Sequence, residues 1–415
     1  MAHWFHRNVF KATTIVHFDI PFVHQDGQAV QLCSQLKQTR QGLLQVLPDV
    51  NYGPETIESA FGSYFSLLMG LLTDPTDANQ VSKLRQSVVF KWTNSLLGNS
   101  PQVVKDSFFE AFNICFNLAI WYMKHASMVA AKDDITLDEA KDVHVSLKKA
   151  AGIFQFIQSM YLPQLGSEQI EAGDLDRRIL AAYLTQCTAE AQEVTLARAV
   201  ELKHNPCLIS SLAFETSKMF SDAAASLRSL EPAAQWKLYL QLKSAFYKAF
   251  AYKYCGENLL SQDKCGDAIR ALKEALACYG QASELCKEYS KKKGPAPKAS
   301  PEDHPFFKRL APQLKITLEK CERENGFIYH QKVPHDPPQL EEKATYGLVN
   351  PDDFGIPSIS KLWTPVTYAA FNDATSKSNS NSTSKKPEKD LPPVKETPVH
   401  QTSKEPKNEN GCSLQ

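Results

Sequence analysis

The clearest chemical signal in the sequence is a cysteine four residues from its end, in Cys412-Ser413-Leu414-Gln415. A cysteine at this position is the acceptor of a prenyl group, and a final Gln favours farnesyl over geranylgeranyl. Ser413 departs from the pattern, which has an aliphatic residue there. The preceding residues 376–411 are rich in Ser, Lys, Asn and Pro, which is typical of a disordered tail that leaves the thiol accessible. The sequence therefore predicts a covalent farnesyl group on Cys412.

One lipid of this kind gives only marginal, reversible membrane binding, and stable attachment takes a second contribution. Residues 376–411 contain seven Lys and five acidic residues, a net charge of +2. This is too diffuse for electrostatic attachment, which takes about four to eight clustered cations. A protein partner on the same membrane would supply the second contribution through avidity. We therefore expect a cytoplasmic protein that associates reversibly with membranes.

No other arrangement of residues in the sequence favours catalysis or metal binding. The ten Cys include no CxxC pair and the eleven His show no ligand spacing, so we expect free thiols in a reducing compartment. The nucleotide, hydrolase and zinc-protease motifs GxGxxG, GxxxxGKS/T, GxSxG and HExxH are absent. The 46 basic residues balance the 46 acidic ones, which excludes a global field that would attract nucleic acid. The sequence predicts a non-enzymatic protein with no cofactor and no metal.

Helical periodicity governs most of the chain. From about residue 28 onward, apolar residues recur at spacings of three and four, which is typical of long helices with a wide buried face. The clearest helical hairpin is 245–280, where two such runs flank a polar turn with Gly266 and resemble a tetratricopeptide repeat. Thr136 and Glu139 form a capping-box pattern that predicts the start of a helix. Successive hairpins of this kind predict a helical solenoid.

The remaining patterns set the boundaries of this solenoid. Thr14–Phe18 alternates apolar and polar residues and predicts a β-strand. After Pro334 the sequence becomes Pro-rich and less periodic, with its last apolar cluster at 363–371, which indicates an extended segment lying along the helices. We expect one mainly α domain over residues 1–375, with a tetratricopeptide-like core and a small N-terminal β-sheet. A disordered tail over residues 376–415 follows it.

Collinear blocks of the sequence resemble the BRO-one domain family. They include MAHWFHRNVFKAT at 1–13, FKWTNSLLGN at 90–99, AEAQEVTLARAVELK at 189–203 and KATYGLVNP at 343–351. The resemblance covers residues 1–375 and implies a boomerang-shaped helical fold. It also implies a monomeric, non-enzymatic adaptor that binds the C-terminal amphipathic helix of charged multivesicular body protein class four. That partner is the filament-forming subunit of the ESCRT-III membrane-scission machinery.

The resemblance also implies where the partner helix binds. Aligned through the AQEV motif, two aliphatic anchors of the family's apolar patch match Leu208 and Leu212, which are spaced to lie one helical turn apart. The aromatic residue that follows AQEV in the family is Thr195 here. Tyr346 and Leu348 match the adjacent edge of the groove. We expect an exposed aliphatic strip that accepts leucines of the partner.

Other interpretations of the same residues remain open. Leucines at a spacing of four are also typical of an ordinary helical core. Tyr329 matches a tyrosine that is exposed and phosphorylated in some relatives, and a packed aromatic is the other interpretation. A tetratricopeptide-type adaptor unrelated to ESCRT would need a cluster of Lys and Arg that clamps a peptide carboxylate. The surface chemistry of the groove distinguishes the two kinds of adaptor.

Overall fold

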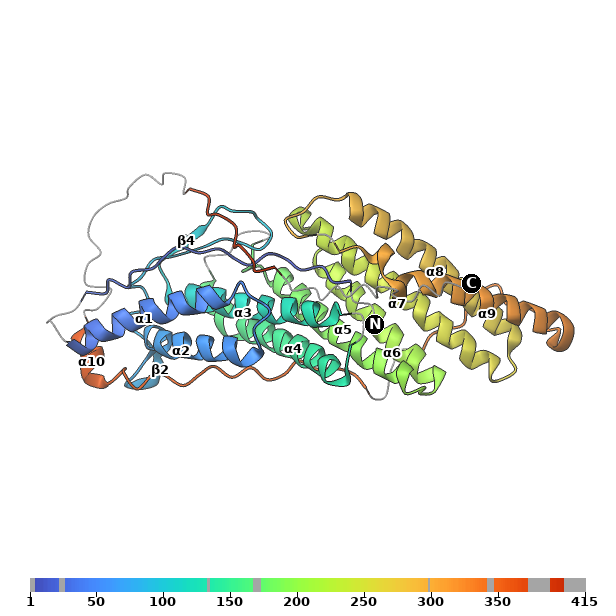
Figure 1. The fold of residues 1–415 in the computed structure, drawn as a ribbon, viewed down its shortest axis with the longest axis horizontal. Coiled ribbons are helices and arrows are strands. Elements are labelled where there is room, and N and C mark those ends of the chain that lie inside the picture. The colour runs from blue at the N-terminus through green and yellow to red at the C-terminus, as the bar shows by residue number, and fades with distance from the viewer. Residues whose placement is uncertain are drawn as a thin grey trace, which may run out of the picture.

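The computed structural model describes residues 4–21, 27–132, 135–166, 173–297, 299–341, 347–371 and 389–398, and helices make up most of them (Figure 1). The helices are α1 (Gly27–Val46), α2 (Pro54–Leu72), α3 (Ser107–Ala130), α4 (Leu137–Phe156), α5 (Arg177–Glu201), α6 (Pro206–Ser226), α7 (Ala234–Leu260), α8 (Cys265–Lys291), α9 (Pro305–Glu324) and α10 (Pro365–Ala370). The strands are β1 (Thr73–Asp74), β2 (Asp77–Val81), β3 (Phe90–Trp92) and β4 (Gln102–Val104). The molecule is elongated, with α1 and α2 toward one end and α8 and α9 toward the other (Figure 1). The mainly α prediction is confirmed.

Successive helices from α3 to α9 pack on one another along the molecule. The hairpin predicted at 245–280 is formed by α7 and α8. A Cβ added at Gly256 of α7 would lie 3.0 Å from Cγ of Leu272 in α8, so the glycine lets these helices approach closely. The predicted helical hairpin is therefore confirmed, together with the small residue that its close packing requires.

Both β-sheets are two-stranded and lie between α2 and α3 in the sequence, with β1 paired to β2 and β3 paired to β4. The strand predicted at Thr14–Phe18 is wrong. Of residues 4–21, Thr13 alone forms a β-bridge, with Trp92. Side chains in the predicted stretch do alternate between core and solvent, but the carbonyl of Thr14 accepts from the guanidinium of Arg40 at 2.8 Å. The Arg40 side chain thus provides the hydrogen bond that a neighbouring strand would provide in a sheet.

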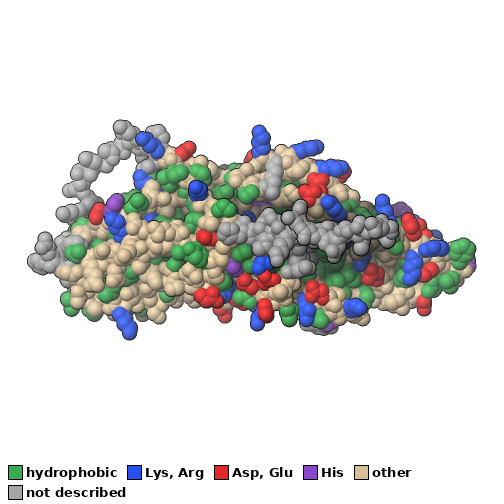
Figure 2. Space-filling model, viewed as in Figure 1, with side chains coloured by type: hydrophobic (Ala, Val, Ile, Leu, Met, Phe, Trp, Pro, Cys, Tyr) green, Lys and Arg blue, Asp and Glu red, His purple; other side chains and the backbone are tan. Residues whose placement is uncertain are grey.

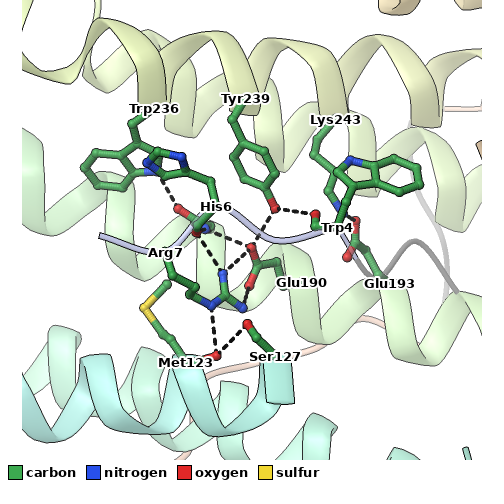
Figure 3. Close-up of polar contacts among 11 residues, drawn as sticks. Trp4, His6, Arg7, Met123, Ser127, Glu190, Glu193, Trp236, Tyr239 and Lys243 are labelled. Carbon is green, nitrogen blue, oxygen red and sulfur yellow. Dashed lines mark hydrogen bonds and ion pairs between the residues drawn. The ribbon is translucent and has the colours of Figure 1, made fainter. Parts of the chain in front are cut away.

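The N-terminal segment around Arg7 joins α3, α5 and α7 through polar contacts (Figure 3). Arg7 donates to both carboxylate oxygens of Glu190 in α5, at 2.9 and 2.7 Å, and to the carbonyl of Met123 in α3 at 2.8 Å. Tyr239 of α7 donates to the same carboxylate at 2.9 Å. Arg7, Glu190 and Tyr239 are all more than nine-tenths buried, so removing either Arg7 or Glu190 would leave a buried charge unpaired. This network fixes one face of α5.

Residues 347–371, here called the strap, run along the helices and end in α10 (orange, along the lower edge of Figure 1). A Cβ added at Gly152 of α4 would collide with the Asp352 carbonyl oxygen, so only glycine leaves room for the strap to pass. Lys148 pairs with Asp352 at 2.6 Å, and Trp363 Nε1 donates to the Leu67 carbonyl at 2.7 Å. The extended segment predicted after Pro334 is confirmed over this stretch.

The prediction of a disordered tail is wrong for residues 389–398, which lie against the folded body. The Thr397 amide donates to the Pro48 carbonyl at 3.0 Å, and Glu396 pairs with Lys124 of α3 at 2.8 Å. The composition concealed this docking, because few large apolar residues are present and their spacing is neither helical nor strand-like. The rest of the predicted tail falls outside the described residues.

Charges of both signs are interspersed over the visible face of the molecule, in line with a net charge of zero (Figure 2). Across the described ranges, no helix combines the length and the apolar character needed to cross a membrane. The mostly apolar stretch at 111–123 is buried within α3. Its hydrophobicity therefore belongs to the core.

Candidate functional site

A groove of about 870 Å³ opens between the start of α4, the C-terminal half of α5 and the start of α6. Much of its wall is apolar, from Ile135, Leu137, Ala140, Val194, Ala197, Ala199, Leu202, Leu208 and Leu212. These side chains come from three helices and their flanking residues. The fold thus gathers separate parts of the sequence into one apolar surface.

The helix starts beside the groove are fixed by capping side chains. The Thr136 hydroxyl accepts from the Glu139 amide at 3.2 Å, and the Glu139 carboxylate accepts from the Thr136 amide at 2.9 Å, so the predicted capping box is confirmed. At the start of α6, the side-chain oxygen of Asn205 accepts from the Cys207 amide at 2.8 Å, and Pro206 occupies the first helical position. The first turns of α4 and α6 therefore have defined positions at the groove wall.

The groove brings together three of the predicted site residues, Thr195, Leu208 and Leu212. Thr195 and Leu208 are half-buried. Leu212 is only 2% exposed, so the expectation of two exposed leucines is wrong for this residue. Leu212 packs in the hydrophobic core, and the strap also lies next to it, because a Cβ added at Gly347 would lie 3.4 Å from Leu212 Cδ2 and 3.9 Å from Thr195 Cγ2. Leu212 forms the floor of the groove beneath the strap backbone.

Gln192 of α5 holds the strap in this position. Its side-chain Nε2 donates to the Gly347 carbonyl at 2.8 Å, and its Oε1 accepts from the Val349 amide at 2.8 Å. Gly347 has a φ of 82°, a left-handed conformation that glycine adopts without strain. Gln192 belongs to the AQEV motif, but a single Gln in a helix gives no signal of a distant backbone partner. Sequence reasoning therefore missed its role.

Two exposed leucines at the rim were also missed. Leu137 is the first residue of α4 and is 63% exposed, and Leu202 directly follows α5 and is 53% exposed. Each lies at a helix end, where the spacing of three and four that marks a helical face stops. Exposed leucines that border an apolar groove are typical of an interaction surface. Their position next to capping residues is the signal that would have found them.

The polar part of the lining carries both charges. Its described charged residues are two acids and two bases, Asp138, Glu201, Lys141 and Arg198. That lining therefore lacks the cation cluster of a carboxylate clamp. His144 Nε2 lies 3.4 Å from Thr195 Oγ1, and burial, reinforced by the charge of Lys148, lowers the pKa of this histidine. Within the described part of the chain, no group of three or more His, Cys, Asp or Glu is placed to hold a metal ion.

Of the other predicted site residues, Leu348 is described and is not part of the groove lining. Leu348 belongs to the strap and is 44% exposed. Tyr346 and Cys412 lie outside the described residues. Tyr329 is half-buried against the core, and its hydroxyl donates to Asp263 at 3.0 Å, as expected for a packed aromatic.

Comparison with known proteins finds relatives that match most of this chain. The model of the BRO1-like domain matches residues 23–391. The human BRO1 domain-containing protein BROX is 50% identical over 374 residues, which cover 90% of this chain and 91% of that protein. The Danio rerio protein of the same name is 45% identical over 414 residues, 99% of each chain. The Caenorhabditis elegans BROX homolog is 39% identical over 426 residues, 100% of each chain.

Solved structures share the fold at low sequence identity. A chain of the ALIX BRO1 CHMP4C complex superimposes with a TM-score of 0.65 at 19% identity, over 86% of this chain and 98% of that chain. A Bro1 domain solved in a study of endosomal targeting gives a TM-score of 0.58 at 19% identity, over 88% of this chain and 95% of that chain. The matched domain spans most of the sequence, and one relative is 50% identical over about nine-tenths of both chains. This chain therefore belongs to the BRO1-like domain family.

Proposed function

We propose that this protein is a non-enzymatic adaptor that binds the C-terminal amphipathic helix of charged multivesicular body protein class four, an ESCRT-III subunit, in the groove between α4, α5 and α6. The observation that carries the proposal is the apolar lining of this groove. It occurs in a fold shared with the ALIX BRO1 domain, which has been solved in a complex with CHMP4C. A groove of this kind suits a helix that presents one apolar face.

The rim of the groove supplies the accessible contacts. Leu137 and Leu202 are exposed, and Leu208 is half-buried, so a partner helix would cover them on binding. Full burial of a leucine contributes about 1.5–3 kcal/mol. Much of that gain offsets the lost rigid-body freedom of the partner and the ordering of its side chains. Binding through a few leucines is therefore reversible, as an adaptor requires.

The floor of the groove sets its shape. Leu212 lies under the strap at Gly347, and Thr195 stands where the family carries an aromatic residue. A smaller side chain at position 195 leaves the groove deeper and removes apolar contact area. Leu348, exposed on the strap, and Tyr346 would contact the partner only at the edge of the site.

The proposal includes a farnesyl group on Cys412, which rests on the terminal sequence. The lipid alone would bind membranes weakly, and simultaneous capture of a membrane-assembled partner would add avidity. Intact-mass measurement of the protein from eukaryotic cells tests the lipid, with Cys412→Ser as the control. A mass equal to that of the unmodified chain would refute the lipid and leave the groove proposal unaffected.

Calorimetry tests the groove. We expect saturable one-to-one binding when the full chain is titrated with a synthetic peptide of the partner's C-terminal helix. A matched peptide whose apolar-face leucines are replaced by Asp should give no binding. Equal binding of both peptides, or no binding of the native peptide, would refute the proposed function.

A further inference from the structure

A second binding surface lies away from the groove, where residues 391–398, here called the tail segment, return to the body. The tail segment is the dark red stretch near the upper edge of Figure 1, across the molecule from the orange strap. Its first amide, on Leu391, donates to the Asn99 carbonyl at 2.9 Å. Near its other end, the Thr397 amide donates to the Pro48 carbonyl at 3.0 Å. The segment is thus held at both ends.

The burial pattern of the tail segment has a repeat of three. Leu391, Val394 and Thr397 are half-buried, whereas the residues between them are exposed. Three residues per turn is the repeat of a polyproline II helix, and Pro392 and Pro393 suit that conformation. Polyproline segments dock in grooves lined by aromatic and apolar side chains. The tail segment therefore presents one defined face to the body.

The body surface beneath this face is largely apolar. Phe10, Leu44 and Leu47 line a space of about 200 Å³ that Pro392 and Val394 of the tail segment also line. The tail segment covers this space without filling it.

The body surface also contains a buried lysine, Lys124, that forms an ion pair with the tail segment. The Lys124 side chain in α3 is 8% exposed, and its Nζ lies 2.8 and 3.0 Å from the carboxylate oxygens of Glu396. Burial lowers the pKa of Lys124, Glu396 opposes this shift, and the nearby Arg7 reinforces it. A buried ammonium is costly without a carboxylate partner. Glu396 provides that partner from 272 residues away in the sequence.

We propose that the body surface formed by Phe10, Leu44, Leu47 and Lys124 is an intramolecular docking site for residues 391–398. We further propose that this docking fixes where the lipid-bearing end of the chain leaves the body. The inference that the tail segment docks depends only on these contacts. Its consequence for the membrane rests on the proposed farnesyl group at Cys412.

That consequence follows from chain length. Cys412 lies fourteen positions after Pro398 and forty-one positions after Phe371. A chain spans at most about 3.3–3.6 Å per residue, so docking limits Cys412 to roughly 50 Å from Pro398. Without docking, the limit is roughly 145 Å from Phe371. Docking therefore keeps the lipid near the turn between α1 and α2, and release lengthens the tether.

Hydrogen exchange of the full chain tests the docking. We expect the Leu391 and Thr397 amides to be protected, and Glu396→Lys to accelerate their exchange about tenfold, the factor that ~1.4 kcal/mol represents. Lys395→Glu, at the exposed neighbouring position, is the matched control and should leave protection unchanged. Pairing Lys124→Glu with Glu396→Lys should restore protection. Fast exchange of both amides in the wild type, or equal protection in Glu396→Lys, would overturn the docking.

Neutron reflectometry on a supported phosphatidylcholine bilayer tests the tether with the farnesylated chain. The body of Glu396→Lys should occupy a wider range of heights above the bilayer than that of the wild type. Equal height distributions, with docking shown by exchange, would overturn the tether consequence. If the farnesylated wild type does not bind the bilayer, the lipid-anchor part of the proposed function fails, while the exchange result still decides the docking.

Discussion

Gly347 lies so close to Leu212 that a Cβ on the glycine would be 3.4 Å from Leu212 Cδ2. This contact joins the strap to α6 and covers the floor of the groove with backbone. Leu212 is 2% exposed, whereas Leu202 at the rim is 53% exposed. The two leucines therefore have separable roles, one in the shape of the groove and one in its contact surface.

These separate roles predict different effects on folding stability for two similar substitutions. Leu212→Asp places a carboxylate in a closed apolar site and should lower the free energy of unfolding by about 3 kcal/mol or more. Leu202→Asp, at an exposed position, should change it by no more than about 0.5 kcal/mol. Urea unfolding of the two variants measures the difference. Wild-type stability of Leu212→Asp would show that the strap does not seal this site.

The passage of the strap over α4 predicts a second pair of variants. A Cβ at Gly152 would collide with the Asp352 carbonyl oxygen, so Gly152→Ala should destabilise the fold by about 1–3 kcal/mol. Gly62 of α2 has open space around its Cβ position, so Gly62→Ala should stabilise its helix by about 0.5–1 kcal/mol. Thermal unfolding would separate the two. Equal melting temperatures would mean that the strap lies elsewhere in solution.

Burial of His6 predicts a pH dependence of stability. Burial lowers its pKa to about 3 from 6.5, and its ring nitrogens lie 3.1 Å from Tyr289 Oη and Asn8 Oδ1. The unfolded chain takes up this proton near pH 6.5, while the folded chain excludes it until about pH 3. The stability from His6 is therefore complete above pH 6.5 and falls as the pH falls. Between pH 6.5 and 5 the loss is about 2 kcal/mol, at 1.36 kcal/mol per pKa unit.

Ionisation of Glu193 changes the stability in the opposite direction over the same pH range. Burial raises its pKa to about 7 although Lys243 lies 2.7 Å away, so its contribution is complete below pH 4.5 and is lost as the pH rises through 7. The two effects oppose each other in the wild type. His6→Gln removes one of them, and on acidification from pH 6.5 to 5 it should gain about 2 kcal/mol relative to the wild type. Parallel pH dependence of the two proteins in urea unfolding would refute a neutral, buried His6.

Local features of the fold were predictable because the groups that interact are close in sequence. The capping box at Thr136 lies within four residues, and the hairpin at 245–280 is set by helical spacing and a turn. The wrong strand prediction at Thr14–Phe18 shows the limit of reasoning from local sequence. Its alternation indicated extended backbone, but the partner of the Thr14 carbonyl is the Arg40 side chain, which no local pattern encodes.

The candidate site shows the same limit more strongly. The family resemblance placed Leu208 and Thr195 at the groove, but the cover over Leu212 comes from a strap residue 135 positions later. The docked tail escaped prediction for a related reason. Its composition lacks the apolar content of a core element, and its ion pair with Lys124 spans 272 residues.

Calorimetric titration with the partner-helix peptide tests the groove most directly when three full-length proteins are compared. These are the wild type, Leu202→Asp at the rim, and Val366→Asp, a substitution at a 73% exposed position on α10. We predict binding at least about tenfold weaker for Leu202→Asp, or ~1.4 kcal/mol, and unchanged binding for Val366→Asp. Equal affinity of all three proteins would contradict the assignment of this groove as the partner site.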